Sequence, residues 1–200
     1  TAGLVRLRLS EHRSLKKVKI YEKPAGSTFH VGAFGVEFIR INHSVPDAVS
    51  IALKTPAGVV VDTGDFKIDT TPISGEMIDL TRFGELGRQG VLLLMADSTN
   101  AERPGFAMSE QKVGRALEAQ FKGTDKRILV ATFASNVHRV QQIINTAAKF
   151  GRKVAVSGRS LDNIVKVTTE LGYMDIPPGL LIDINMVRKY PDDQLCIITT

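Results

Sequence analysis

After residue 90 the sequence alternates between short apolar runs and amphipathic segments, and this alternation constrains the fold more than any other feature. The apolar runs have the length of buried strands, and the segments between them repeat apolar residues at helical spacing. Alternation of this kind predicts a parallel, Rossmann-like sheet. The expected order is strand 91–96, helix 109–121, strand 128–132, helix 136–150, strand 153–156, helix 160–171 and strand 195–198.

Before residue 90 the pattern is different, with short strands separated by tight turns. Thr55-Pro56-Ala57-Gly58 is one such turn, and its composition favours a hairpin. We expect an antiparallel layer here and a boundary near residue 106, after the linker-like Glu102–Gly105, so that residues 1–105 and 106–200 form two domains. The expected strands are 4–9, 28–31, 36–41, 49–55 and 59–62.

Composition narrows the class of protein. The formal charge is +5, from 26 basic and 21 acidic residues scattered along the chain, so nucleic acid is a plausible partner. No apolar run approaches the roughly 18 residues of a membrane span, and we expect no membrane partner. The single cysteine, Cys196, lies in an apolar stretch; it excludes an intramolecular disulfide, fits a reducing cytoplasm and is expected to pack in the core.

The stretch VVVDTGDFK places two carboxylates, Asp62 and Asp65, around a glycine where a core strand ends. His43 follows another strand, VEFIRI, and Asp47 four residues on offers a carboxylate for its second ring nitrogen. If neighbouring strands bring both loops to one edge of the sheet, His43 and Asp65 converge as zinc ligands do, and Asp65 could bridge two metals. The alternative is an ordinary polar loop. His12 and His30 lack such neighbours and are expected to be surface or satisfied polar residues.

A third strand, 91–96, ends on Asp97-Ser98-Thr99-Asn100. This pattern is also that of a strand followed by an Asx turn. Because sites in layered α/β folds collect at the carboxyl ends of strands, Asp97 joins the candidates for catalysis.

The strand at 128–132 gives way to a helix within FASNVHR. Free backbone N–H groups, Ser135, Asn136 and the cations of His138 and Arg139 could face an anion such as phosphate. The alternative is that Ser135 or Asn136 is only an N-cap, which leaves a cation on the first helical turn unexplained. The stretch 157–160 repeats the arrangement, with Ser160 as the expected cap and a weaker claim on phosphate.

The stretches INHSVPD, TGDFKID, ADSTNAERPG and FASNVHRVQQ together resemble the bacterial ribonuclease J group of the metallo-β-lactamase/β-CASP nucleases. The resemblance runs across nearly the whole chain, in order. It implies an α/β fold class: the second part of a metallo-β-lactamase αββα layer followed by a Rossmann-like β-CASP domain, both incomplete.

The resemblance also implies roles for individual residues. His43 and Asp65 become zinc ligands, with Asp65 bridging two Zn²⁺ ions, and Asp65 and Asp97 become catalytic. The loop of Ala134, Ser135 and Asn136, with His138, is expected to contact substrate phosphate. The implied function is a zinc-dependent ribonuclease, both endonuclease and 5′-to-3′ exonuclease, acting on RNA in the cytoplasm as a homo-oligomer (dimer or tetramer) or with a paralogous subunit.

The sequence also departs from the family pattern. It contains no His-x-His, although the family's zinc motif has one, and it ends directly after the IITT stretch at 197–200. We therefore expect a middle slice of a longer protein, which alone binds zinc weakly and cuts RNA slowly or not at all. Three alternative functions remain open. The first is a β-CASP enzyme that acts on DNA or a lactamase-fold thioesterase, and the second is a non-catalytic RNA-binding or assembly module. The third is a nucleotide-binding Rossmann domain, although the chain lacks the usual Gly-x-Gly-x-x-Gly after its strands.

Overall fold

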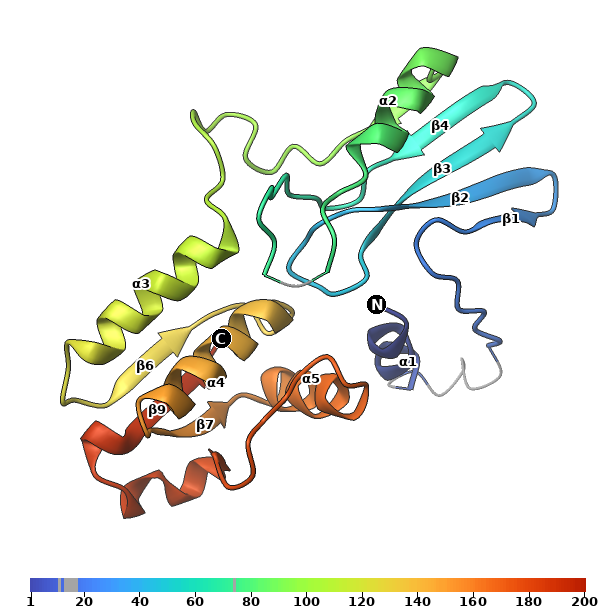
Figure 1. The fold of residues 1–200 in the computed structure, drawn as a ribbon. Coiled ribbons are helices and arrows are strands. Elements are labelled where there is room, and N and C mark those ends of the chain that lie inside the picture. The colour runs from blue at the N-terminus through green and yellow to red at the C-terminus, as the bar shows by residue number, and fades with distance from the viewer. Residues whose placement is uncertain (11, 13–17, 74) are drawn as a thin grey trace. The chain divides into compact units, whose positions relative to one another are not determined.

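The computed structural model describes residues 1–10, 12, 18–73 and 75–200, which form two compact units (Figure 1). One unit takes in Val18–His43 and Asp47–Ser109 and contains an antiparallel sheet. The other takes in Ser44–Pro46 and Glu110–Thr200 together with the N-terminal helix α1, and contains a parallel sheet. Each unit is described below by itself.

The antiparallel unit is built on a five-stranded sheet in the order β1-β2-β3-β4-β5. Strands β1 to β4 pair antiparallel, as the tight turns predict, whereas β5 pairs parallel to β4. The small core of this unit lies between the sheet and helix α2, which supplies Leu86. The elements are β1 (Thr28–Val31), β2 (Phe34–Arg40), β3 (Val49–Thr55), β4 (Gly58–Asp62), α2 (Leu80–Gln89) and β5 (Leu93–Met95).

Strand β5 was expected to be buried, and this expectation is wrong. The side chains of Leu93, Leu94 and Met95 are 51%, 59% and 45% exposed. Among the described residues β5 pairs with β4 on one side only, and none of its side chains belongs to the buried core that includes Val61 and Leu86. The apolar pattern of residues 91–96 correctly predicted a strand. Such a pattern does not show whether other elements cover the strand.

The parallel unit carries a four-stranded sheet in the order β6-β9-β7-β8, in which every pair is parallel. This confirms the Rossmann-like arrangement of the second half. Its core is extensive, with α4 and α5 contributing most of the buried side chains. The elements are β6 (Ile128–Ala131), α3 (Glu110–Lys122), α4 (Val137–Lys149), β7 (Lys153–Ser157), α5 (Arg159–Glu170), β8 (Leu181–Ile182), β9 (Leu195–Thr199) and the short 3₁₀ helices η2 (Ile184–Lys189) and η3 (Asp192–Gln194).

Two local expectations are wrong. Residues 4–9 were expected to form a strand but belong to helix α1 (Ala2–Ser10), where Leu4 packs against the core of the parallel unit. Apolar and basic residues alternate here, which mimics a strand, and tertiary packing decides the outcome. Ser160 was expected to cap α5, but the N-cap is Gly158, without any side-chain hydrogen bond, and Ser160 lies inside the helix.

Cys196 is buried in the core of the parallel unit, as expected. Burial raises the pKa of its thiol to about 12, so the thiol is protonated at neutral pH and unreactive while the unit is folded. His12 and His30 are both exposed, in line with the surface role expected for them. None of the helices within the described residues has the length and apolar character that crossing a membrane requires.

Candidate functional site

The loop after β4 is held by a dense set of hydrogen bonds around Thr63. Its backbone N–H donates to the Met95 carbonyl at 2.9 Å, and its hydroxyl accepts from the Asp97 N–H at 3.0 Å. The buried Ser50 hydroxyl donates to the Thr63 carbonyl at 2.6 Å. Because β4 and β5 are parallel, both strands end at the same edge of the sheet, and Thr63 ties the two ends together.

Asp65 is delivered by a glycine turn. Asp62 Oδ1 accepts from the Gly64 N–H at 2.9 Å, and Gly64 has φ of +57°, in the left-handed region that favours glycine. This turn places the exposed Asp65 directly beyond the end of β4. The two carboxylates beside the glycine therefore have different roles. Asp62 stabilises the turn through its hydrogen bond, whereas Asp65 is exposed to solvent.

His43 reaches the same edge through the bridge between Asn42 and Lys67. The Lys67 N–H donates to the Asn42 carbonyl at 2.7 Å. The Asn42 side chain is fixed in turn, accepting from Ile78 N–H at 2.8 Å and donating to the Glu76 carbonyl at 2.9 Å. The half-buried His43 comes one residue after this bridge, and Lys67 comes two residues after Asp65.

Asp97 completes the cluster. Its Oδ1 accepts from the Thr99 hydroxyl at 2.6 Å and from the Thr99 N–H at 2.9 Å, which is the predicted Asx-type turn. These two bonds, with smaller contributions from the Phe66 N–H and the charge of His43, hold the pKa of Asp97 below its usual range. Asp97 is therefore ionised at neutral pH and within electrostatic reach of His43. The three predicted residues of this unit, His43, Asp65 and Asp97, all follow strand ends at one edge of one sheet.

The donor set of this edge falls short of a complete metal site. Over residues 1–10, 12, 18–73 and 75–200, no three His, Cys, Asp or Glu side chains are placed to hold one ion. His43 and Asp65 offer nitrogen and oxygen donors of the kind zinc uses, but a catalytic zinc takes about three protein ligands. His43 and Asp65 therefore match zinc in the type of donor atom but not in the number of ligands.

In the parallel unit, the loop after β6 is arranged differently from the expectation. The Asn136 side chain caps α4 by accepting from the Arg139 N–H at 3.1 Å. The Arg139 guanidinium, expected to face an anion, instead pairs with Glu110 of α3 at 2.7 Å. The N-cap interpretation therefore holds for Asn136, and the cation on the first turn is explained by an ion pair between helices.

The remaining residues of that loop keep their predicted positions. Ala134 is half-buried and Ser135 exposed at the carboxyl end of β6, and His138 lies half-buried on the first turn of α4. The Thr132 N–H donates to the Thr199 carbonyl at 2.9 Å, which fixes the start of the loop against β9.

Sequence reasoning missed two charged groups that organise the units. In the antiparallel unit, Arg82 of α2 forms a two-pronged ion pair with the buried Glu37 of β2. In the parallel unit, the buried Arg152 donates to the backbone carbonyls of residues 124, 126 and 195. Arg82 and Glu37 lie far apart in the sequence, so their pairing could not be predicted from it. The partners of Arg152 are backbone carbonyls, which every residue has, so the sequence does not identify them either.

The sequence is similar to those of known proteins over nearly its whole length. Residues 125–200 match the family model described as "Ribonuclease J, beta-CASP domain". The chain is 41% identical over 200 residues to Ribonuclease J of Helicobacter pylori (strain 26695), which covers 99% of this chain and 29% of that protein. It is 44% identical to Ribonuclease J of Synechocystis (99% of this chain, 31% of that protein) and 38% identical to Ribonuclease J2 of Bacillus subtilis (100% and 36%).

The fold has a counterpart among solved structures. A crystal structure of a protein of unknown function from Enterococcus faecalis V583 superposes with a TM-score of 0.68 at 15% sequence identity, covering 100% of this chain and 51% of that one. This likeness concerns the fold alone. The chain spans about a third of the length of the curated relatives it matches.

Proposed function

Because the chain belongs to the ribonuclease J family of β-CASP proteins, we propose that the full-length protein hydrolyses phosphodiester bonds of RNA. One observation carries the proposal: strands β4 and β5 and the Asn42 bridge bring an imidazole and two carboxylates to one edge of a sheet. Groups of this kind, placed at strand ends, perform acid, base and metal-binding roles in hydrolysis.

In this proposal Zn²⁺ is the cofactor, and His43 and Asp65 are two of its protein ligands. The remaining ligands come from parts of the full-length protein outside these residues, in keeping with relatives about three times as long. Asp97 holds a negative charge beside His43 and is a positioning residue for that imidazole. Its two hydrogen bonds from Thr99 lower its pKa and fix the carboxylate, which supports this role.

On the substrate side, the loop of Ala134, Ser135 and Asn136, with His138, contacts RNA phosphate. Support comes from the exposed Ser135 at a strand end and from the net charge of +5, which favours a polyanion. Phosphate contacts of this kind carry no sequence preference. We further propose both endonucleolytic and 5′-to-3′ exonucleolytic cleavage, by a cytoplasmic homo-oligomer.

The test uses the full-length protein, end-labelled RNA and a DNA oligonucleotide of the same sequence. Asp65→Asn should reduce RNA cleavage by about 100-fold or more, because removing one carboxylate ligand from a catalytic metal costs several kcal/mol. Asp193→Asn is the control: it removes a carboxylate from the exposed 3₁₀ helix η3, outside the candidate site, and should leave the rate unchanged. Cleavage that survives Asp65→Asn, or that prefers DNA, would contradict the proposal.

A second candidate function applies to the 200 residues alone, namely RNA binding without cleavage. It is favoured by the incomplete metal cluster among the described residues. Filter binding of RNA by the 200-residue chain, without cleavage in the presence of zinc, would support it. Two tightly held zinc ions per chain in equilibrium dialysis would contradict it.

A further inference from the structure

Thr63 is a buried polar residue to which the proposed function assigns no role. It comes directly after β4 and is only 8% exposed. Its hydroxyl accepts from the Asp97 N–H at 3.0 Å and donates to the Gly64 carbonyl at 2.8 Å. The Gly64 carbonyl belongs to the peptide group that joins Gly64 to Asp65. The hydroxyl therefore links the peptide group before Asp65 to the backbone of Asp97 through two hydrogen bonds.

The main chain of Thr63 is fixed independently of its hydroxyl. Its N–H donates to the carbonyl of Met95 on β5 at 2.9 Å, and its carbonyl accepts from the hydroxyl of Ser50 on β3 at 2.6 Å. Ser50 is fully buried, so this second bond lies inside the sheet. The Thr63 hydroxyl is thus attached to a point that β3, β4 and β5 hold in common.

Asp97 also contacts the backbone on the other side of Asp65. The Phe66 N–H is among the groups that lower the pKa of Asp97, because it donates to the carboxylate. Thr63 lies two residues before Asp65, and Phe66 lies one residue after it. The turn that carries Asp65 is therefore bonded to Asp97 at both of its ends, through the Asp97 N–H at one end and through the Asp97 carboxylate at the other.

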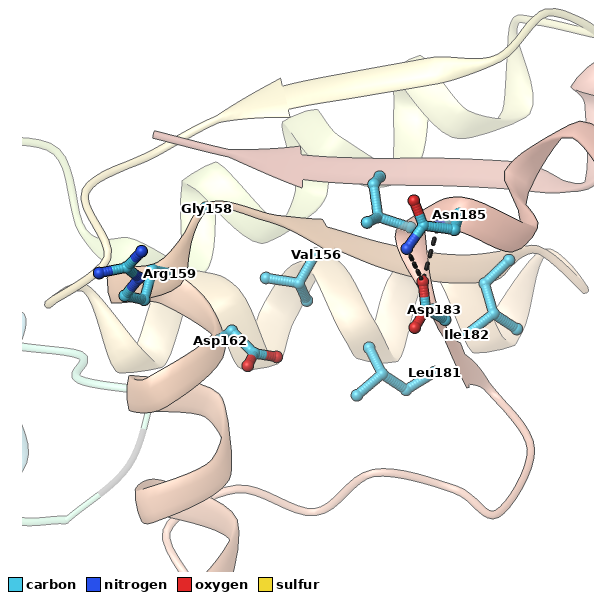
Figure 2. A pocket seen from close by; sticks show the side chains of 9 residues that line it. Val156, Gly158, Arg159, Asp162, Leu181, Ile182, Asp183 and Asn185 are labelled. Atoms are coloured by element: carbon cyan, nitrogen blue, oxygen red, sulfur yellow. Dashed lines mark hydrogen bonds between the residues drawn. The ribbon is translucent and has the colours of Figure 1, made fainter.

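A second pair of parallel strands shows that the Thr63 link is not a general consequence of this arrangement. Strands β7 and β8 are parallel, like β4 and β5, and each pair leads into an aspartate after its second strand. Asp183 Oδ1 accepts from the Asn185 N–H at 2.7 Å and from the Asn185 side-chain amide at 2.9 Å, a local turn like that at Asp97 (Figure 2). The residue after β7 is Gly158, which has no side chain to bond across to the neighbouring strand end. A local turn is therefore enough to fix an aspartate at such a strand end, and the Thr63 hydroxyl is an additional feature.

We propose that the Thr63 hydroxyl is a positioning group that couples the turn carrying Asp65 to the loop carrying Asp97, so that the two carboxylates hold a fixed relation to one another. The effect on catalysis rests on the proposed function, whereas the coupling itself does not. Without the hydroxyl, the Asp97 N–H loses its acceptor and the Gly64 carbonyl loses its donor. Each loop can then move without the other.

The test compares three variants of the full-length protein. Thr63→Val keeps the shape of the side chain without its hydroxyl, and Thr63→Ser keeps the hydroxyl. Thr55→Val is the matched control, because the Thr55 hydroxyl donates to the Gly58 carbonyl at 2.8 Å and accepts from the Gly58 N–H at 3.2 Å. Thr55 ends β3 at the opposite edge of the same sheet, so its loss removes similar bonds away from the candidate site.

The first measurement is amide hydrogen exchange, resolved to single amides by mass spectrometry, with neither metal nor RNA present. Exchange of the Asp97 N–H should become about tenfold faster in Thr63→Val and stay close to the wild-type rate in Thr63→Ser. Thr55→Val should accelerate exchange at Gly58 and leave Asp97 unchanged. Protection of the β2 and β3 amides verifies that each variant is folded, and Thr63→Ala replaces the valine variant if this protection is lost. Unchanged exchange at Asp97 without the Thr63 hydroxyl would overturn the coupling, whether or not the protein cleaves RNA.

The second measurement is the kinetics of RNA cleavage. Thr63→Val should lower kcat by about 10–100-fold, the usual cost of losing a group that orients a ligand or a catalytic residue, and leave KM nearly unchanged. Thr63→Ser should restore kcat, and Thr55→Val should not lower it. Equal losses in Thr63→Val and Thr55→Val, or faster exchange at Asp97 with kcat unchanged, would overturn the positioning role and leave the proposed function intact. A wild-type protein that does not cleave RNA contradicts the proposed function instead, and the exchange measurement alone then decides the coupling.

Discussion

The two units position their polar residues by different physical means. In the parallel unit, the candidate binding residues follow strands that are anchored in an extensive core, where α4 and α5 bury apolar side chains against the sheet. In the antiparallel unit, the core is small, and β5 leaves its apolar side chains exposed. There, His43, Asp65 and Asp97 are placed by hydrogen bonds of Thr63, Asn42 and Thr99.

Among the described residues, the candidate site is thus held by hydrogen bonds at the loop ends, with only a small core in its unit. Core packing constrains elements over their whole length, whereas the hydrogen bonds around Thr63 constrain only the loop ends where the carboxylates lie. The two units should therefore respond differently to substitutions in the core, to acid and to changes in a single turn.

The largest effect is expected from the core of the parallel unit. Ile143→Ala should lower its free energy of unfolding by about 2–5 kcal/mol, because Ile143 is fully buried at the centre of the cluster. Cys196 is the only cysteine of the chain and lies in the same core, so its labelling by a thiol reagent reports on this unit. Val61→Ala, in the core of the other unit, is the matched control and should not accelerate labelling. Equal acceleration by both variants would show that the units unfold together.

An intermediate effect is expected from acid on the antiparallel unit. The hydrogen bonds and charge of Arg82 hold the pKa of Glu37 below its ordinary 4.5. The resulting stability is present above that value and is lost as the pH falls through the lowered pKa. Glu37→Gln should cost about 2 kcal/mol at neutral pH and remove part of the acid sensitivity. Urea unfolding between pH 7 and 3 measures this, and an unchanged pH dependence in the variant would contradict the assignment.

A smaller effect is expected from the turn that carries Asp65. Gly64→Ala should destabilise the antiparallel unit by about 1 kcal/mol, because φ of +57° disfavours any residue with a Cβ. Gly84→Ala lies inside α2 with open space around it and should stabilise by up to about 1 kcal/mol, as alanine favours helix. If both variants changed the free energy of unfolding in the same direction, the positive φ at Gly64 would not be what makes alanine unfavourable there.

Much of this architecture follows from the sequence. The strand 49–55 and the β-α alternation after residue 90 were predicted because a pattern of apolar residues is a local property. Helix α2 was missed because Gly84 and Gly87 lower its helical propensity, although the Asp79 N-cap, which accepts from the Arg82 N–H at 3.0 Å, was a usable signal. Helix α1 was predicted as a strand because apolar and basic residues alternate along it. Its contact with α5 depends on the fold and could not be predicted from the sequence.

The sequence indicated which residues of the candidate site to consider, but it could not indicate their partners. The Asx turn at Asp97 is local and was foreseen as an alternative, whereas the bond between Thr63 and Asp97 joins two strand ends and required the sheet. The ion pair of Arg139 with Glu110 likewise depends on how α3 packs against α4. Local chemistry is visible in a sequence, and pairing across elements is not.

In the proposed function, His43 and Asp65 bind metal together at the edge where β4 and β5 end. Anomalous scattering at the zinc edge, from crystals of the full-length protein, tests it most directly. If both residues are ligands, zinc density should be in contact with the His43 imidazole and the Asp65 carboxylate. Zinc bound elsewhere in the protein, with neither residue among its ligands, would contradict it.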